Sequence, residues 1–398
     1  MRDALIRAPR VLLGPEGERV EDGAVLVHDG TILAVGPHAE LEPRRAPTTP
    51  VFDFPDSTLL PGLINCHVHL AFDAQPDPVT TFQNSNREQL LEGMADRAGQ
   101  ALRCGITTLR DLGDDGTVFA LRDAIATGTR PGPRILASGP PLTVEGGHCH
   151  FFGGIVDDAS LRTAVREHAA AGADLIKIMV SGGSITPGGA AMYESQFTLE
   201  QLRIVVDEAC RAGLRVAAHA HGADAITDSV QAGVTTIEHC GWMIGPAEYD
   251  RREQVARSMA AQGIYACGAF SHDWERFYQR LGERGPKVFA RFQWMDALGV
   301  PFIAGTDAGL SGSVFDRYAL ALAMYAWLGF TNERILEFAT INAADALGLA
   351  DTTGRLAAGL ASDLLVVDGN PLADIQNLDK VRLVMTPTSM YVFDGHGT

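Results

Sequence analysis

Eight strand-like apolar runs alternate with segments of helical period between about residue 61 and about residue 350. The runs are LINCHVHL, ITTLRDL, RILASGP, DLIKIMV, LRVAAHAH, VTTIEHC, IYACGA and VPFIAGTD. The segments between them, such as ASLRTAVREHAAAGA and TLEQLRIVVDEACRAG, repeat apolar residues at helical spacing. Eight such units over about 290 residues have the size of a (β/α)8 barrel. A doubly wound open sheet is the alternative, but no GxGxxG or phosphate-binding loop follows the first run.

The two ends of the chain have a different pattern from the middle. Residues 1 to about 60 hold the short runs VLLG, AVLVHDG and TILAVGP, separated by glycine, proline and charged turns at hairpin spacing. After about residue 350 short strands return, in ASDLLVVDG, VRLVMTP and TSMYVFDG. We therefore predict an α/β chain with a barrel over residues 61–351 and a small β domain built from residues 1–60 and 352–398.

Composition restricts the partners of this chain. The 398 residues include 32 Lys and Arg against 49 Asp and Glu, a formal net charge of −17, which disfavours nucleic acid and anionic membrane surfaces. No window approaches the ~18 uninterrupted apolar residues of a membrane span, and charge, proline and glycine interrupt the N-terminal stretch before a signal-peptide core could form. We expect a cytoplasmic homo-oligomer that takes a small-molecule substrate.

Histidines gather where three of the runs end. The first run ends in His67 and His69, the fifth in His219 and His221, and the sixth in His239, so five of the 12 histidines lie at strand ends. Strand alternation places each His-x-His pair on one face, and catalytic groups of a (β/α)8 barrel lie at the carboxyl ends of its strands. Histidine is the commonest metal ligand, so the pattern predicts a metal site, with satisfied core histidines as the alternative.

A lysine interrupts the fourth run, DLIKIMV. An isolated ammonium in a low-dielectric interior costs several kcal/mol, so a buried lysine is normally neutral, paired or chemically altered. Lys177 shares a strand face with Leu175 and Met179 and lies near the carboxyl end. A neutral amine can add carbon dioxide to form a carbamate, an anion able to bridge two divalent cations. A Schiff base, which explains no histidines, and a buried ion pair are the alternatives.

The eighth run ends in Thr306 and Asp307. A carboxylate at this strand end can bind one metal, accept the proton of a bridging water and pass it to the leaving group. The alternative is that Asp307 caps the next helix, since aspartate is a favoured N-cap residue.

Six ordered motifs, spanning nearly the whole chain, resemble the amidohydrolase superfamily and more narrowly its imidazolonepropionase-like, prolidase-type branch. They are LLPGLINCHVHL, LIKIMVSGG, QFTLEQLRIVVDEACRAGLRVAAHAHG, AGVTTIEHC, AGTDAG and GRLAAGLASDLLVVDGNPL. The resemblance implies a distorted (β/α)8 TIM barrel beside a small β-sandwich, and a centre of two divalent metal ions, usually Zn2+.

The resemblance also implies roles for individual residues. It implies metal ligands at His67, His69, Lys177, His219, His239 and Asp307. Lys177 would carry a carbamate formed from carbon dioxide, and Asp307 would be the general base. His148, in EGGHCHFFGG, would reach the substrate carbonyl or carboxylate, and His221 would contact substrate or support the ligands.

The chain departs from the pattern of that branch at two places. Asn65 stands where many relatives have an aspartate before the first histidine pair, which would alter a hydrogen bond behind the ligands. The loop EGGHCHFFGG contains His150, Phe151 and Phe152, which either line an aromatic pocket or pack the loop itself.

Two further residues have open roles. Arg110, at the end of the second run, pairs either with a substrate carboxylate or with an acid such as Asp111. Tyr193 lies in a loop rich in glycine and proline, which is either a lid or a plain surface loop.

We expect a hydrolase that cleaves an amide-type C–N bond of a dipeptide or N-acyl amino acid, through a hydroxide that bridges the two metals, with Asp307 as proton shuttle. A urea, carbamate or cyclic amide is the rival substrate class, and fold analogy does not decide between them. A single-metal imidazolonepropionase or deaminase would typically lack Lys177 and carry a glutamate where this chain has Gly222. A non-enzymatic scaffold would predict missing ligands, and none is missing.

Overall fold

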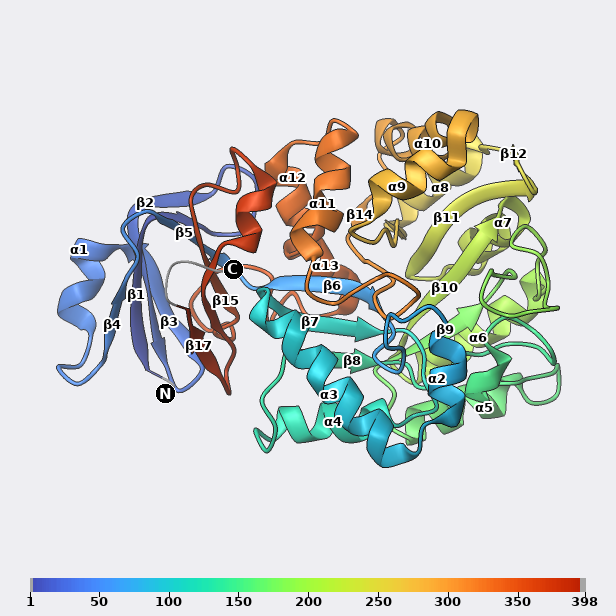
Figure 1. Ribbon diagram of the computed structural model, residues 1–398, viewed down its shortest axis with the longest axis horizontal. Coiled ribbons are helices and arrows are strands. Elements are labelled where there is room, and N and C mark those ends of the chain that lie inside the picture. The colour runs from blue at the N-terminus through green and yellow to red at the C-terminus, as the bar shows by residue number, and fades with distance from the viewer. Residues whose placement is uncertain (1–2, 394–398) are drawn as a thin grey trace.

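The computed structural model describes residues 3–393 and shows a barrel beside a smaller sheet built from both chain ends (Figure 1). The strands are β1 Ala4–Leu12, β2 Arg19–His28, β3 Thr31–Pro37, β4 Val51–Asp53, β5 Ser57–Pro61, β6 Leu63–Val68, β7 Ile106–Asp111, β8 Arg134–Ala137, β9 Leu175–Met179, β10 Arg215–Gly222, β11 Thr236–Gly245, β12 Glu248–Tyr249, β13 Tyr265–Cys267, β14 Phe302–Ile303, β15 Leu364–Asp368, β16 Val381–Met385 and β17 Met390–Val392. The helices are α1 His38–Leu41, α2 Pro78–Asn84, α3 Arg87–Arg103, α4 Val118–Ala126, α5 Leu161–Ala170, α6 Leu199–Arg211, α7 Ala223–Ala232, α8 Glu253–Gln262, α9 Trp274–Leu281, α10 Gly285–Ala297, α11 Tyr318–Trp327, α12 Asn332–Phe338 and α13 Ile341–Leu347. Short 3-10 turns are η1 Glu42–Arg44, η2 His150–Phe152, η3 Gly282–Arg284 and η4 Ile375–Asp379.

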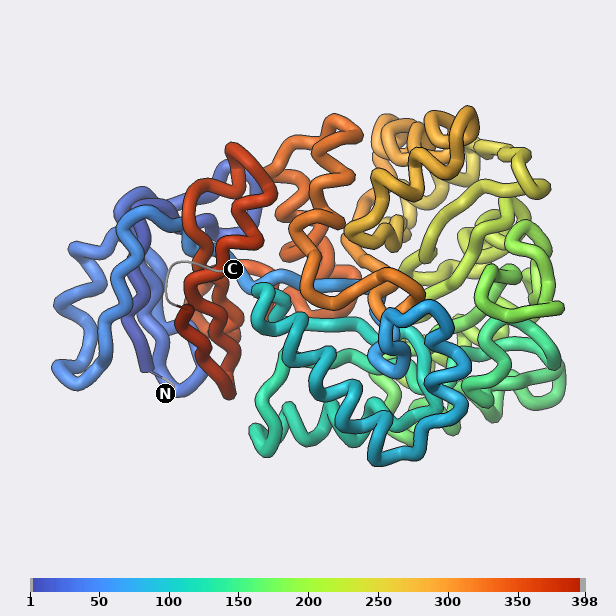
Figure 2. The backbone as a smooth tube through the Cα atoms, viewed as in Figure 1, coloured from blue at the N-terminus to red at the C-terminus, as the bar shows by residue number. Residues whose placement is uncertain are grey.

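The small sheet joins the first and last segments of the chain. Its order is β17-β16-β15-β5-β1-β2-β3, with β4 also paired to β1, and Figure 2 shows the blue and dark red segments side by side. Strand β5 links the two halves, because it pairs with β1 in parallel and with β15 antiparallel. The predicted small domain of both ends is confirmed in this arrangement, whereas its boundaries at residues 60 and 352 stay a prediction, and residues 394–398 lie outside the described part.

Strand β15 contributes to two cores at once. Leu364 and Val366 pack in the core shared by the halves of the small sheet, whereas Leu365 and Val367 pack in the main core of the barrel. Alternation of side chains along a strand produces this division. The contact is close, because a Cβ added at Gly105 would lie 2.7 Å from Leu365 Cδ2. Strand β15 is therefore packed directly against the barrel.

Each of the eight predicted runs contains one barrel strand. Parallel ladders join β6-β7-β8 and, separately, β14-β13-β11-β10-β9. Backbone hydrogen bonds outside these ladders close the two seams. At one seam Leu142 N–H donates to the Lys177 carbonyl at 2.8 Å, and at the other Cys66 N–H donates to the Ala304 carbonyl at 2.9 Å. The barrel is thus complete but distorted, as predicted.

The barrel interior beside α13 holds an apolar cluster. Inward-facing side chains of the strands form one cluster with α13: Ile64, Cys66, Leu175, Ala217, Cys267, Ile303, Ala343, Ala344 and Leu347. The candidate ligands His67, His219 and Asp307 lie toward the opposite, carboxyl ends of the strands, where the active sites of such barrels are found.

Helix starts follow local sequence signals. Asn86 and Gln89 form a reciprocal pair of hydrogen bonds at the start of α3, and Thr198 and Gln201 do the same at the start of α6. Within residues 3–393 no helix is both long and apolar enough to cross a membrane.

Candidate metal centre

The carboxyl ends of β6, β10, β11 and β14 bring the predicted metal ligands together. Two groups of potential ligand atoms each lie within 4.8 Å of one another: His67, His69 and Asp307 form one, and His219, His221 and His239 form the other. The groups adjoin, since the ring centroids of His67 and His239 are 5.2 Å apart. Predicted ligands as distant in sequence as His67 and Asp307 thus share one site, although their assignment as ligands stays a prediction.

In the first group, one nitrogen of each imidazole faces the carboxylate of Asp307. Asp307 Oδ1 lies 3.2 Å from His67 Nε2 and 3.3 Å from His69 Nε2. The other nitrogens have acceptors: His67 Nδ1 is 2.9 Å from Glu238 Oε2, and His69 Nδ1 is 3.4 Å from the Gly113 carbonyl. Because those acceptors favour a proton on Nδ1, the Nε2 lone pairs are left for a metal.

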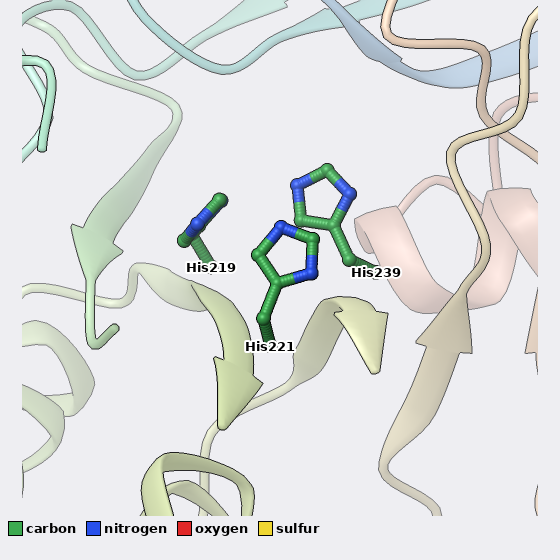
Figure 3. A group of neighbouring side chains, drawn as sticks. All are labelled: His219, His221 and His239. Atoms are coloured by element: carbon green, nitrogen blue, oxygen red, sulfur yellow. The ribbon is translucent and has the colours of Figure 1, made fainter. Parts of the chain in front are cut away.

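In the second group, three imidazoles from β10 and β11 converge (Figure 3). The rings of His221 and His239 are stacked, with centroids 4.4 Å apart. His219 Nε2 is 3.1 Å from the Gly182 carbonyl, which leaves Nδ1 free to bind a metal. Burial lowers the pKa of all three histidines, in His221 to about 4, so each is held in the neutral form that binds metals.

Lys177 is buried among these ligands without a partner. Its side chain is 1% exposed, and Nζ has no hydrogen-bond partner in residues 3–393. Burial lowers the pKa of this amine, and a charge on it would in turn lower the pKa of His69, His219 and His239. No salt bridge to Lys177 is present in the described part of the chain, so an ion pair does not explain this lysine. A buried amine whose Nζ has no hydrogen-bond partner among the described residues, and whose pKa is lowered by burial, fits a carbamate that bridges two metals.

Asp307 has an unusual backbone conformation and caps no helix. Its backbone has φ +58°, and that of His239 has φ +68°, a left-handed conformation that non-glycine residues rarely adopt and that is typical of functional sites. Burial opposes ionisation of Asp307, but the His67 and His69 imidazoles hold the pKa of its carboxyl well below the usual range. The next helix, α11, begins only at Tyr318, so the alternative that Asp307 is an N-cap residue is wrong.

Glu238 is a site residue that sequence reasoning missed. Its carboxylate is inaccessible and lies between His67 Nδ1, at 2.9 Å from Oε2, and Arg110 Nη2, at 2.7 Å from Oε1. Arg110 also donates to the Cys66 carbonyl at 2.6 Å and to Thr236 Oγ1 at 2.9 Å. The structural role of Arg110 is thus confirmed, but its acid is Glu238 and not Asp111. The available signal was a charged residue inside the apolar run VTTIEHC, the same signal that identified Lys177.

Asn65 fastens the first histidine pair to the last strand. Its Nδ2 donates to Thr306 Oγ1 at 2.8 Å, and its Oδ1 accepts from the His67 backbone N–H at 3.3 Å. The amide therefore links the ends of β6 and β14, where an aspartate would supply only acceptors.

His148 reaches the site from the loop after β8. Its ring centroid is 4.6 Å from that of His219, and Thr186 Oγ1 lies 3.1 Å from its Nδ1. A Cβ at Gly183 would lie 2.3 Å from this ring, so glycine is required there. Burial lowers the pKa of His148 to about 3, which keeps the imidazole neutral. Its role in substrate binding stays a prediction.

The neighbouring aromatic residues pack the loop. Phe151 and Phe152 pack against Phe72 and Phe82 in tilted and edge-on arrangements, with ring centroids 4.9 to 6.4 Å apart. His150 Nδ1 is 3.0 Å from the Gly147 carbonyl. Of the two predicted roles, loop packing is therefore the one observed.

Tyr193 explains why the position after His221 is glycine. A Cβ at Gly222 would lie 2.6 Å from the Tyr193 carbonyl oxygen. The loop that carries Tyr193 thus lies on the end of β10, where the glutamate of a single-metal enzyme would have to stand.

A cleft of about 700 Å³ opens from His221, His239 and Asp307 toward α9 and α10. Its apolar lining includes Met192, Met243, Phe270, Trp274, Phe277 and Leu310. Its charged lining consists of Arg276, Arg280, Arg284 and Arg291 against the two acids Asp273 and Asp307. The sequence did not predict that α9 and α10 form one wall of this cleft, because residues 270–291 contain no motif that distinguishes them from a surface helix pair.

Comparison with known proteins identifies the family. The sequence model of the amidohydrolase family matches residues 58–390, and one for a bacterial imidazolonepropionase-like composite domain matches residues 23–44. The chain therefore belongs to the amidohydrolase family. It is a hydrolytic enzyme that acts on amide-type C–N bonds.

Relatives resemble the chain over nearly its whole length. Ochratoxinase of Aspergillus niger is 26% identical, with 94% of this chain and 83% of that protein aligned, and its crystal structure matches with a TM-score of 0.84 over 98% of this chain and 96% of that one. Imidazolonepropionase of Mesorhizobium japonicum is 28% identical over 88% of this chain and 87% of that protein. A Xaa-Pro dipeptidase with bound methionine matches at 26% identity with a TM-score of 0.84, covering 98% of this chain and all of that one.

Proposed function

We propose that the chain is a hydrolase with two divalent metal ions, Zn2+ being the expected one, that cleaves the amide bond of a dipeptide or N-acyl amino acid. The observation that carries the proposal is the partnerless Nζ of Lys177 amid the histidines. The similarity to a Xaa-Pro dipeptidase supports a dipeptide-like substrate.

The ligands would divide between the two ions. His67, His69 and Asp307 would hold one ion, and His219 and His239 the other, in line with the two groups of close ligand atoms. Lys177 would join them as a carbamate, formed when its neutral amine adds carbon dioxide and releases one proton. Two such ions lower the pKa of a water toward neutrality and polarise a carbonyl.

The residues of the chain supply the remaining steps. The Asp307 carboxylate, ionised at neutral pH, accepts the proton of the attacking water and delivers it to the leaving amine. Glu238 fixes the orientation of the His67 ring, since it accepts from Nδ1. His148 and His221 border the site and would contact the substrate, whose apolar part the cleft accommodates.

A single-metal imidazolonepropionase or deaminase fits the site less well. Such an enzyme has no use for a buried neutral lysine, and the Tyr193 backbone fills the space beside Gly222. The cytoplasmic location and the homo-oligomeric state stay predictions from the sequence.

Metal analysis and a hydrolysis screen test the proposal. Protein produced with added zinc should contain about two equivalents, and Lys177→Ala should lose one of them together with most activity. The panel consists of dipeptides, N-acyl amino acids, ureas and lactams. Lys287→Ala, on the exposed surface of α10, is the matched control and should keep both metals. The proposal would be contradicted if Lys177→Ala still bound two equivalents of metal. It would also be contradicted if the wild-type enzyme hydrolysed only the ureas and lactams of the screen.

A further inference from the structure

Arg291 is a buried cation without an anion at the edge of the metal centre. It lies on α10, is 7% exposed and lines the same cleft as His221, His239 and Asp307. Its Nη1 donates to the Val288 carbonyl, and its Nη2 donates to the His239 carbonyl at 3.3 Å. Its Nε has no hydrogen-bond partner among residues 3–393. The donors of the guanidinium are thus only partly used within the protein.

The surroundings of Arg291 are aromatic and contain no balancing carboxylate. The guanidinium carbon lies 4.4 Å from the ring centroid of Phe292 and 5.5 Å from that of Phe270. Within the described residues Arg291 forms no salt bridge. Buried arginines are normally paired, because an uncompensated buried charge is strongly destabilising. We therefore expect an anion that enters the cleft to pair with the Arg291 guanidinium.

The outer part of the same wall is also basic. Arg276, Arg280 and Arg284 follow one another at a spacing of four residues, and all three line the cleft. In the part of the chain that the structure describes, none of the three forms a salt bridge. The protein as a whole has a formal net charge of −17, so this local excess of positive charge is opposite to the overall balance. Such a cleft raises the local concentration of anions.

We propose that the Arg291 guanidinium binds the carboxylate of the substrate, and that Arg276, Arg280 and Arg284 draw anionic substrates into the cleft. A planar guanidinium matches a carboxylate through two parallel hydrogen bonds, which a lysine cannot reproduce. The inference rests on the proposed function and deepens it, because it assigns the residue that selects substrates with a free carboxylate.

Calorimetry on the metal-loaded, full-length protein tests this role. The probes are N-acetyl-L-phenylalanine and N-acetyl-L-phenylalaninamide, which differ in the charge of one group. Wild-type protein should bind the carboxylate more tightly than the amide. Arg291→Gln should weaken carboxylate binding by roughly tenfold to a hundredfold, as expected for hydrogen bonds to a charged group, and leave amide binding unchanged.

Two further variants make the test specific. Arg291→Lys keeps the positive charge but lacks the planar guanidinium with its paired donors, so it should retain only part of the carboxylate preference. Arg203→Gln removes an exposed arginine of α6 and should match the wild type. Arg276→Gln combined with Arg280→Gln should slow association of the carboxylate at low ionic strength and leave its dissociation rate unchanged.

The outcomes separate this inference from the proposed function. Equal weakening of both probes by Arg291→Gln would show a structural role and overturn the inference, as would wild-type protein that binds the two probes equally or binds neither. A carboxylate preference that survives Arg291→Gln in an active enzyme would also overturn it and leave the proposed function intact. A preference that depends on Arg291 in a protein that hydrolyses nothing in the screen would support the inference and contradict the proposed function.

Discussion

Two glutamates of this protein are almost equally hidden, yet their surroundings differ. Glu238, on β11 inside the barrel, is 0% exposed and is bound by Arg110, itself 2% exposed. Glu208, on α6 at the outer surface, is 3% exposed and is bound by Arg162, Arg166 and Arg211, whose side chains are 47 to 65% exposed. One carboxylate is buried together with its partner, whereas the other is covered by its partners.

The difference determines what each carboxylate can do. Burial opposes the charge of Glu238, but Arg110 and His67 hold the pKa of its carboxyl well below the usual range. Because the side chains of Glu238 and Arg110 are both shielded from solvent, removing either one would leave the other as an unpaired buried charge. The arginines around Glu208 lower its pKa, chiefly through the Arg166 hydrogen bond, but they stay solvated and are screened by salt. We therefore expect Glu238 to affect both folding and the metal centre, and Glu208 to affect stability alone.

The largest expected effect is that of Glu238→Gln. The variant leaves the Arg110 guanidinium buried without an anion, which should lower the free energy of unfolding by about 3 to 5 kcal/mol. It also weakens the acceptor behind His67 Nδ1, so metal affinity should fall by about tenfold to a hundredfold. Denaturant unfolding measures the first effect, and competition with a chelator measures the second.

A double variant separates these two consequences. Glu238→Gln with Arg110→Met removes both charges, so much of the lost unfolding free energy should return. The acceptor behind His67 is still weakened, so metal affinity should stay low. If Glu238→Gln alone lowered the unfolding free energy by less than about 1 kcal/mol, the pair would behave like a solvated one and the contrast with Glu208 would be lost.

The interior of the barrel shows what sequence could predict. The alternation of runs predicted all eight strands, and the rule that chemistry lies at strand ends selected His67, His219 and Asp307. Lys177 was recognisable because a charge in an apolar run is costly wherever that run is buried. These inferences need only local spacing, and they hold whatever the detailed packing is.

The partners of these residues could not be predicted in the same way. Arg110 binds Glu238 across a separation of 128 residues, which depends on how the barrel closes. Arg291 and Arg284 look alike in the sequence, yet one is buried against Phe292 and the other is exposed. The contact of the Tyr193 backbone with Gly222 depends on the path of a loop that has no periodic pattern. Pairings of this kind arise from tertiary packing and not from local signals.

A smaller effect is expected for Gly305→Ala, which tests how tightly the interior around Glu238 is packed. The new Cβ would lie 2.6 Å from His67 Cβ and 2.7 Å from Cys267 Sγ, so the His67 side chain must move. Overpacking of this kind typically lowers the free energy of unfolding by about 1 to 3 kcal/mol. Metal affinity should fall as well, and chelator competition with denaturant unfolding measures both.

Gly36→Ala, in the small sheet, is the matched control for that substitution. No heavy atom lies within 4 Å of the added Cβ, so stability should change by no more than about 0.5 kcal/mol. Wild-type metal affinity and stability in Gly305→Ala would mean that the strand ends relax easily, and rigid packing would no longer distinguish the interior from the surface.

The smallest effect is expected for Glu208→Gln, and it depends on pH. The arginines hold the pKa of Glu208 below its ordinary value of 4.5, so the carboxylate contributes stability above that pH and loses it as the pH falls through the folded-state value. Thermal unfolding of wild type and Glu208→Gln should therefore differ at neutral pH and converge in acid, with the difference shrinking in high salt. Glu253→Gln, which breaks the exposed pair with Arg257, should change less still. Metal content should be unchanged in both variants. A loss of metal in Glu208→Gln would show that the ion pairs on the outer face of α6 influence the metal centre, as Glu238 is expected to do.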